Sequence, residues 1–332
     1  MYTKFFSKPR IYLSIFVVNM CGNMKRYRIL LFCSIFFSLM SGRAQKVDWT
    51  WWNEMADWDG YTPWYNYFTY STSYFGPNAF PVPEMGNGRV PAELQLDLSA
   101  GQYWGFGDNA TDFKFRLDIP VYPERVVVSV WMVPVEYYKT TIHVRDERYA
   151  RKEFPEGVVV GDVYLQTGIQ LVKNHRFLPD IRFNATLKTA SGGPLTDCRY
   201  YDTPGYYFDF NIGKKWTFPN SKFIRSLTVS EMAGFLCWQA MQGFQDDAFL
   251  YGIKLNAAFA KSYFEADWSG YVGWGQPGDK PMIVRAKFSR EFKKIHSLYI
   301  SGLIGLVDYP FYCVRLGYEL AIPCSFNFCK KK

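Results

Sequence analysis

The chain has 332 residues, of which 20% are aromatic, and a formal net charge of +8. Seven of its 38 Lys and Arg residues precede residue 45, where no Asp or Glu occurs, so the rest carries 31 basic against 30 acidic residues. A chain that is nearly neutral beyond its leader lacks the basic surface that phosphate backbones require, which excludes nucleic acid as a partner.

Residues 1–44 are predicted to be a leader with a secretory signal. "MKRYR" from Met24 supplies the charged region, and the next twelve residues, "ILLFCSIFFSLM", supply the apolar region. Gly42 and Ala44 are the small residues expected before a cleavage point at Ala44-Gln45, and Met24 is the predicted functional start. Twelve apolar residues are too few for a spanning helix, which needs roughly 20. The sequence therefore predicts an exported chain without a helical anchor.

Residues 45–90 form an aromatic-rich segment that precedes the first predicted strand. Thirteen aromatic residues lie between Trp49 and Phe80, including Trp51, Trp52, Trp58 and Trp64, and frequent Pro and Gly break any long element. The preferred interpretation is a plug in the lumen of a barrel or a cap at its periplasmic mouth. Sugar stacking and insertion into the inner-leaflet interface are the alternatives.

From residue 91 onward, apolar and polar residues alternate with period two, the pattern of half-buried strands. In "DIRFNATLK", for example, Ile181 and Phe183 alternate with Arg182 and Asn184. Most of the segments reach the ~9–11 residues that a tilted strand needs to cross a bilayer. The twelve predicted strands are 91–101, 110–121, 124–139, 157–172, 179–190, 205–216, 222–238, 247–259, 262–274, 281–292, 296–307 and 311–323.

The connections between these strands alternate in length. The long, Gly-, Pro- and Asp-rich links are 102–109, 140–156, 191–204, 239–246 and 275–280. The tighter links are Tyr122-Pro123, 173–178, 217–221, Ala260-Lys261 and 293–295. Outer-membrane barrels have long loops outside and short turns in the periplasm. Two features depart from this pattern: the short link 308–310, and the strand 124–139, which is apolar on both faces.

The predicted fold class is therefore all-β: a transmembrane antiparallel barrel of about twelve strands spanning 91–323, in the outer membrane of a Gram-negative bacterium. Both ends of the barrel are expected in the periplasm. Aromatic residues near strand ends suggest girdles at the two membrane interfaces. These are Tyr103, Trp104, Trp131, Tyr137, Tyr138, Trp216, Trp238, Trp268 and Trp274. A tail, 324–332, follows, and whether Cys324 and Cys329 form a bridge stays open.

Three stretches, "GDVYLQTGIQL" from Gly161, "PDIRFNATLKTASGG" from Pro179 and "RYYDTPGYYFDFNIGK" from Arg199, resemble uncharacterised Gram-negative outer-membrane barrels. "YFGPNAFPVPEM" from Tyr74 adds to this likeness, which covers roughly residues 57–216. The chain is more loosely similar to outer-membrane proteins associated with aromatic-compound degradation. The resemblance implies a barrel and a channel, and it carries no established catalytic or binding residues.

Catalytic and metal-binding signals are weak. The only position at which a lipid hydrolase could be argued is His143, in the predicted outer link 140–156, because such an enzyme needs a Ser–His pair at the membrane rim. No G-x-S-x-G elbow and no calcium-loop spacing occurs. We therefore expect no metal, no cofactor and no enzymatic activity.

The inward face of the predicted barrel is the more informative feature. A charged side chain facing lipid at the midplane costs ~2–4 kcal/mol, so charges that alternate with apolar residues must face the lumen. The principal lumen candidates are Asp97, Arg116, Asp162, Arg182, Lys188, Asp209, Arg285, Arg315 and Glu319. Charges of both signs either pair across a closed interior or line water.

Three classes of function remain open. The preferred one is a narrow or gated channel for a small solute, followed by a surface binding or assembly module, and then by a lipid-modifying enzyme. Outer-membrane lipid and, during insertion, the barrel-assembly machinery are the expected partners. We also predict that residues 45–88 regulate the lumen, with their carboxylates meeting barrel arginines such as Arg116, and with Trp58 or Trp64 stacking on those arginines.

Overall fold

The computed structural model describes residues 48–239, 245–275, 277–293 and 295–323. The predicted leader 1–44, with its cleavage point, and the predicted tail 324–332, with Cys324 and Cys329, lie outside the described residues. The chain divides into two units, Met1–Asp48 and Trp49–Lys332, and the second contains the sheet and the aromatic-rich segment.

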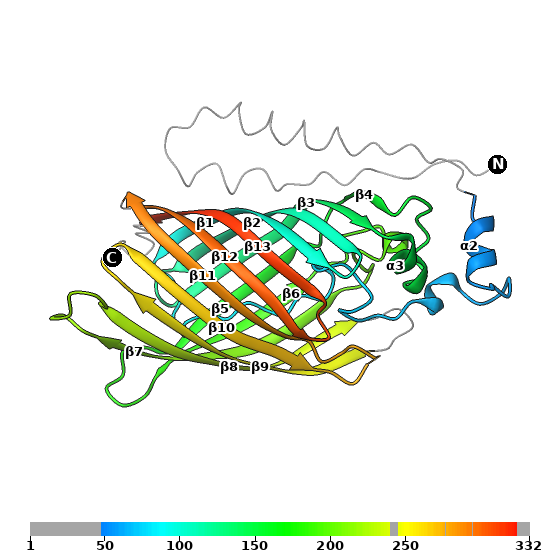
Figure 1. The fold of residues 1–332 in the computed structure, drawn as a ribbon. Coiled ribbons are helices and arrows are strands. Elements are labelled where there is room, and N and C mark those ends of the chain that lie inside the picture. Colours follow the sequence, from blue (N-terminus) through cyan, green and yellow to red (C-terminus); the bar gives the residue numbers. More distant parts are fainter. Residues whose placement is uncertain (1–47, 240–244, 276, 294, 324–332) are drawn as a thin grey trace, which may run out of the picture. The chain divides into compact units, whose positions relative to one another are not determined.

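The described strands form one antiparallel sheet that closes on itself (Figure 1). The last strand, β13, pairs with β1 from Glu93↔Pro323 to Gly105↔Phe311, and this pairing closes the sheet into a barrel. Except for the short β4, which pairs with β3 alone, closure pairs the strands on both sides, as a sheet surrounded by lipid requires. The predicted antiparallel barrel is confirmed. Its strands are β1 Glu93–Gly105, β2 Asp108–Tyr122, β3 Val126–Thr140, β4 Glu156–Val159, β5 Tyr164–Val172, β6 Asp180–Lys188, β7 Gly205–Thr217, β8 Ser226–Gln239, β9 Gln245–Ala258, β10 Ser262–Val272, β11 Met282–Lys293, β12 His296–Val307 and β13 Phe311–Pro323.

Twelve strand positions surround the barrel, because β4 and β5 occupy one position beside β3. β4 pairs with Glu136–Lys139 of β3, and β5 pairs with Val126–Trp131. The predicted single strand 157–172 is interrupted between them at 160–163. At this point the backbone approaches the β6–β7 link, which folds into the barrel, and a Cβ on Gly161 would lie 2.8 Å from the Tyr200 hydroxyl oxygen. Because Gly161 has no side chain, the β6–β7 link can reach the wall.

β3 departs from simple alternation, which accounts for its apolar residues on both faces. Val127 and Ser129 are fully buried at odd positions, whereas Glu136 and Tyr138 are buried at even positions. The pairing with β2 shifts register between these two halves, next to Pro134, which has no N–H to donate to the ladder. The shift turns Glu136 inward, where it becomes part of a buried ionic network.

The alternation of long and short links is largely retained. β3–β4, β6–β7 and β10–β11 are joined by long links, whereas β2–β3, β9–β10 and β11–β12 are joined by short ones. The predicted long link 102–109 is wrong, because β1 and β2 form a hairpin around Phe106 and Gly107 only. The predicted tight link 217–221 is longer than expected and spans 218–225.

Among the described residues, helical structure is confined to short pieces outside the barrel wall. These are α2 Thr50–Met55, η1 Trp64–Tyr67, α3 Ile142–Glu147 and η2 Leu195–Asp197. The hydroxyl oxygen of Thr141 caps α3 by accepting a hydrogen bond of 3.3 Å from the Val144 N–H. Within the described ranges, no helix is long and apolar enough to cross a membrane.

The outer face of the sheet is apolar at alternate positions. On β13, Tyr312, Val314 and Leu316 are exposed, whereas Phe311 and Cys313 are buried. Exposed large apolar side chains recur on β5 to β12 in the same manner. A barrel with an apolar outer face and a polar interior is the arrangement that lies in lipid.

The aromatic girdle is smaller than predicted. Trp104, Tyr137, Trp216, Trp268 and Trp274 are exposed as expected. The assignment is wrong for the other four, because Tyr103, Tyr138 and Trp238 are buried and Trp131 lines an internal cavity. Those four rings point into the barrel, where they pack against chain segments inserted in the lumen.

The aromatic-rich segment enters the barrel at one end and leaves at the other. α2 and η1 lie beside α3, at the end where β1 finishes (Figure 1), and the Trp52 indole donates 2.7 Å to the Tyr149 carbonyl. Residues 68–90 then run along the lumen to the start of β1. The predicted packing of this segment in the barrel is confirmed. The alternative of a cap at the mouth where β1 begins is wrong, because the aromatic cluster lies at the opposite mouth.

Candidate functional site

One end of the lumen is sealed by a fully buried ionic network around Arg199, from the β6–β7 link. The Arg199 guanidinium donates to Glu136 at 2.9 and 2.7 Å and to Asp108 at 2.7 and 2.6 Å. Arg148 donates a further 2.6 Å bond to Asp108, and the Tyr200 hydroxyl donates 2.8 Å to Glu136. Burial alone would lower the pKa of Arg199, but the carboxylates of Asp108 and Glu136 raise it. The network is charged, paired and inaccessible to water.

The first part of the inserted segment packs against this network. Phe80 stacks on Tyr201 with ring centroids 4.3 Å apart, and the Tyr309 hydroxyl donates 2.9 Å to the Pro77 carbonyl. Asn78 donates 2.7 Å to Glu136, so the segment also completes the network. A Cβ on Gly76 would lie 2.6 Å from the Arg199 guanidinium, which shows how tightly the two pack. We call residues 68–80, the β6–β7 link and this network the seal.

Nearer the start of β1, the inserted segment is held by hydrogen bonds to β5, β6 and β7. Asn211 accepts 2.6 Å from the Gly86 N–H, and Gln170 accepts 2.7 Å from the Val90 N–H. Gln170 also donates 2.8 Å to the Gly88 carbonyl, and Arg182 donates 3.4 Å to the Arg89 carbonyl. We call residues 86–90 with these partners the latch.

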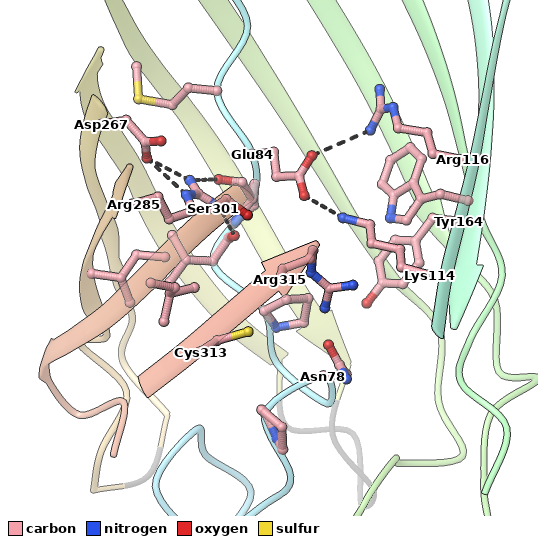
Figure 2. Close-up of a pocket in the computed structure, with 18 of the residues that line it drawn as sticks. Asn78, Glu84, Lys114, Arg116, Tyr164, Asp267, Arg285, Ser301, Cys313 and Arg315 are labelled. Atoms are coloured by element: carbon pink, nitrogen blue, oxygen red, sulfur yellow. Dashed lines mark hydrogen bonds and ion pairs between the residues drawn. The ribbon is translucent and has the colours of Figure 1, made fainter. Parts of the chain in front are cut away.

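Between seal and latch lies a cavity of about 330 Å³. Figure 2 shows Glu84 of the inserted segment pointing toward Lys114 and Arg116 on one side, with Asp267 and Arg285 on the other. A volume of this size falls at the lower end of ligand pockets. A second cavity, of about 160 Å³, lies at the latch, and its lining includes Arg89, Asp180 and Lys215.

Most of the charges that line the main cavity are paired. Arg285 contacts Asp267 at 2.9 Å, and Lys254 pairs with Glu265. Arg315 pairs at 2.7 Å with Asp112, which lies beside the seal. Paired charges of both signs keep the lumen polar without a strong net field. This matches the predicted mixed-charge interior.

All nine predicted lumen residues lie on the inner side of the sheet or, for Asp162, in the break between β4 and β5. Asp97, Arg116, Asp162, Arg182, Arg285 and Arg315 line the main cavity. Lys188 is fully buried and pairs with Asp162 at 2.8 Å. Asp209 is buried and accepts a hydrogen bond of 2.8 Å from Asn184, whereas Glu319 pairs with Lys287. The structure thus brings together six of the nine and leaves three beside them.

The four predicted plug tryptophans lie at the seal end. Trp52 is fully buried, and the Arg151 guanidinium lies 4.7 Å from its ring centroid and 5.0 Å from that of Trp64. Trp51 stacks against the guanidinium of Arg145 on α3, and the Trp58 indole donates a hydrogen bond of 2.6 Å to the Thr62 carbonyl within the segment. The predicted stacking of Trp58 or Trp64 on barrel arginines is wrong. The part of the segment that carries these four tryptophans precedes the residues inserted in the lumen, so arginines of the β3–β4 link supply the contacts.

The other candidate groups are isolated. His143 is exposed on α3, and within the part of the chain that the structure describes, no residue forms a hydrogen bond with its ring. Among the described residues, no group of His, Cys, Asp and Glu could hold a metal ion. Burial raises the pKa of the Cys198 thiol to about 12, which keeps it protonated at neutral pH.

Several site residues were not singled out from the sequence. Arg199 lies in a predicted external loop, Asp108 in a predicted link, and Glu136 behind the register shift of β3. Glu84 carried a signal, since it is the last carboxylate before β1 in a segment expected to reach the lumen. For the first three, only the fold of the loop into the barrel reveals the partners.

No family model and no curated protein sequence matches the chain. Solved structures similar to it include outer-membrane porins, channels and autotransporter domains. An outer membrane channel from Pseudomonas putida F1 is 10% identical over 72% of this chain and 100% of its own, with a TM-score of 0.49. The NanC porin is 11% identical over 68% and 98%, with a TM-score of 0.43. The CymD monoaromatic hydrocarbon channel is 9% identical over 71% and 90%, with a TM-score of 0.35.

Proposed function

We propose that this protein is an outer-membrane barrel that passes a small solute through a gated lumen, the gate being the inserted residues 68–90. The observation that carries the proposal is the cavity of about 330 Å³ between that segment and the wall. Outer-membrane lipid then surrounds the barrel, and the barrel-assembly machinery is its partner during insertion.

The lining of the cavity supports passage more than simple packing. A barrel of twelve strands lies between eight-stranded barrels filled by side chains and open porins of 16–18 strands. Its interior here is filled by a separate segment instead of by wall side chains. Charged groups along the wall, such as Arg116, Lys287 and Arg315, offer transient partners to a polar solute.

The contacts of the gate differ in strength at its two ends. The latch consists of neutral hydrogen bonds of about 0.5–1.5 kcal/mol each, one hydrogen bond from Arg182 of up to about 3 kcal/mol, and one ion pair, Arg89–Asp180, in which the arginine is 37% exposed. Breaking a buried ion pair such as Arg199–Glu136 costs about 3–5 kcal/mol. The latch is therefore the part that opens first, and the seal sets the larger barrier to complete passage.

A reversible tether tests this function. A Cβ on Gly86 would lie 3.8 Å from the Asn211 Cβ, a separation that suits a disulfide. The full chain with Gly86→Cys and Asn211→Cys is reconstituted into planar bilayers, oxidised, and then reduced in place. We expect no current in the oxidised form and solute-dependent current after reduction, with the unsubstituted chain under the same oxidant as control.

Two results would count against the proposal. Absence of current from both the reduced variant and the unsubstituted chain would refute passage. Equal current in the oxidised and reduced forms would refute the latch as a gate, because solute would then pass beside a fixed segment.

A surface binding module is the second candidate, favoured by exposed aromatics at the seal end. Tyr61, Phe106, Phe154 and Trp274 are each more than two-thirds exposed and belong to four different loops or segments at this end. If the tether experiment shows no current, binding to extracellular ligands through this surface becomes the function to test.

A further inference from the structure

Three cations that line the main cavity are unevenly supplied with partners. Arg116 contacts Asp118 at 3.0 Å, and the described residues supply the Lys114 ammonium with one carboxylate, that of Glu84. Arg182 is buried, and among the described residues the acceptors of its hydrogen bonds are neutral: Asn184 at 2.6 Å, Gln166 at 3.2 Å and a backbone carbonyl. Apart from Asp118, the barrel wall provides these three cations with no carboxylate within salt-bridge distance among the described residues. We call Lys114, Arg116 and Arg182 the cation cluster.

Glu84, on the inserted segment, supplies the missing negative charge. Its carboxylate pairs with Lys114 and lies 3.9 Å from Arg116, and its side chain is 54% exposed to the cavity. Lys114 foremost, and then Arg116, hold the pKa of Glu84 well below its usual range against the opposing effect of burial. The carboxylate is therefore ionised at neutral pH and faces open space.

The position of the segment does not depend on this carboxylate alone. Arg285 donates 3.2 and 2.9 Å to the carbonyls of Val82 and Pro83, and Lys254 donates 3.2 Å to the carbonyl of Met85. Backbone carbonyls on both sides of Glu84 are thus held by other cations. The Glu84 side chain can turn away while the backbone around it stays in place.

We propose that the cation cluster is a binding site for the carboxylate of a small organic acid, and that Glu84 occupies this site as an internal substitute until the acid displaces it. The inference rests on the proposed passage of a small solute and names its chemical class. Displacement also removes a contact between gate and wall, so the incoming acid itself loosens the gate. A cavity of about 330 Å³ has room for a small dicarboxylate.

The test measures binding separately from transport. Isothermal titration calorimetry on the detergent-solubilised full chain uses succinate as the probe and succinamide as its neutral analogue. Glu84→Gln should tighten succinate binding at least tenfold, because the internal competitor is gone. Glu124→Gln is the matched control, since Glu124, in the β2–β3 link, is 53% exposed and pairs with Lys173. This control variant should leave the affinity for succinate unchanged.

A wall-side variant makes the test independent of Glu84. Lys114→Met should abolish succinate binding at the site, and heat-modifiable migration on gels verifies that each variant is folded. Unchanged succinate affinity in Glu84→Gln would overturn the proposal. So would equal tightening for succinamide, because Glu84 would then only fill space.

The same samples distinguish the site from the proposed function. Succinate binding with no bilayer current would refute passage and retain the acid site. Current that neither succinate nor Glu84→Gln alters would refute the acid site and retain passage.

Discussion

The seal can be tested by replacing Arg199 with methionine, an unbranched and shorter side chain that removes the charge. The substitution deletes four hydrogen bonds to two buried carboxylates, Asp108 and Glu136. Removing one partner of a buried ion pair costs about 3–5 kcal/mol, because the remaining charge stays buried. Arg148 and Tyr200 still donate to the two carboxylates, so we expect the lower half of that range.

The matched control is Lys139→Met, which removes an ion pair at the surface. Lys139 lies 3.2 Å from Glu156, and the two side chains are 68% and 49% exposed. Exposed pairs of this kind contribute about 0–1 kcal/mol. Guanidinium unfolding of the detergent-solubilised protein, followed by tryptophan fluorescence, gives the free energy of unfolding for both variants. If Arg199→Met loses less than about 1 kcal/mol, or no more than Lys139→Met, the seal does not stabilise the barrel.

Three further predictions follow from the placement of the inserted segment. Cysteine at Tyr61 should react with a membrane-impermeant maleimide on intact cells, whereas cysteine at Phe177, in the opposite β5–β6 link, should react only after the outer membrane is permeabilised; the reverse pattern would refute the orientation. The pKa of Glu84 is lower in the folded state than in the unfolded state, where it is about 4.3. The ion pair of Glu84 therefore stabilises the fold fully above about pH 4.3, and this stabilisation is lost as the pH falls through the pKa of the folded state. Glu84→Gln should therefore be less stable than the unsubstituted chain at pH 7, and this difference in unfolding free energy should vanish in acid; a constant difference would contradict the ion pair. Arg151→Gln removes cation–π contacts at 3.9, 4.7 and 5.0 Å, each contributing about 0.5–2 kcal/mol, so proteolysis within 49–67 should accelerate, and an unchanged cleavage rate would show that these contacts do not hold the segment.

The aromatic-rich segment illustrates where sequence patterns stop being informative. Thirteen aromatic residues in an irregular stretch indicate packing against something large, and that interpretation is confirmed. The same composition says nothing of direction, because an extended chain of this length reaches either mouth. Tertiary contacts such as that of Trp52 with Tyr149 show that the segment starts at the seal end.

The barrel itself was determined by the sequence, because a strand period of two couples each residue to one face, and lipid on one face allows only apolar side chains there. Ile181 and Arg182 could therefore be assigned to opposite faces without a structure. The pairs inside were decided by the tertiary structure alone. Arg199 with Glu136, and Glu84 with Lys114, join residues 63 and 30 positions apart, and only closure of the sheet around inserted chain brings them together. Periodicity is a local property, whereas the partner of a buried charge depends on which distant backbone fills the lumen.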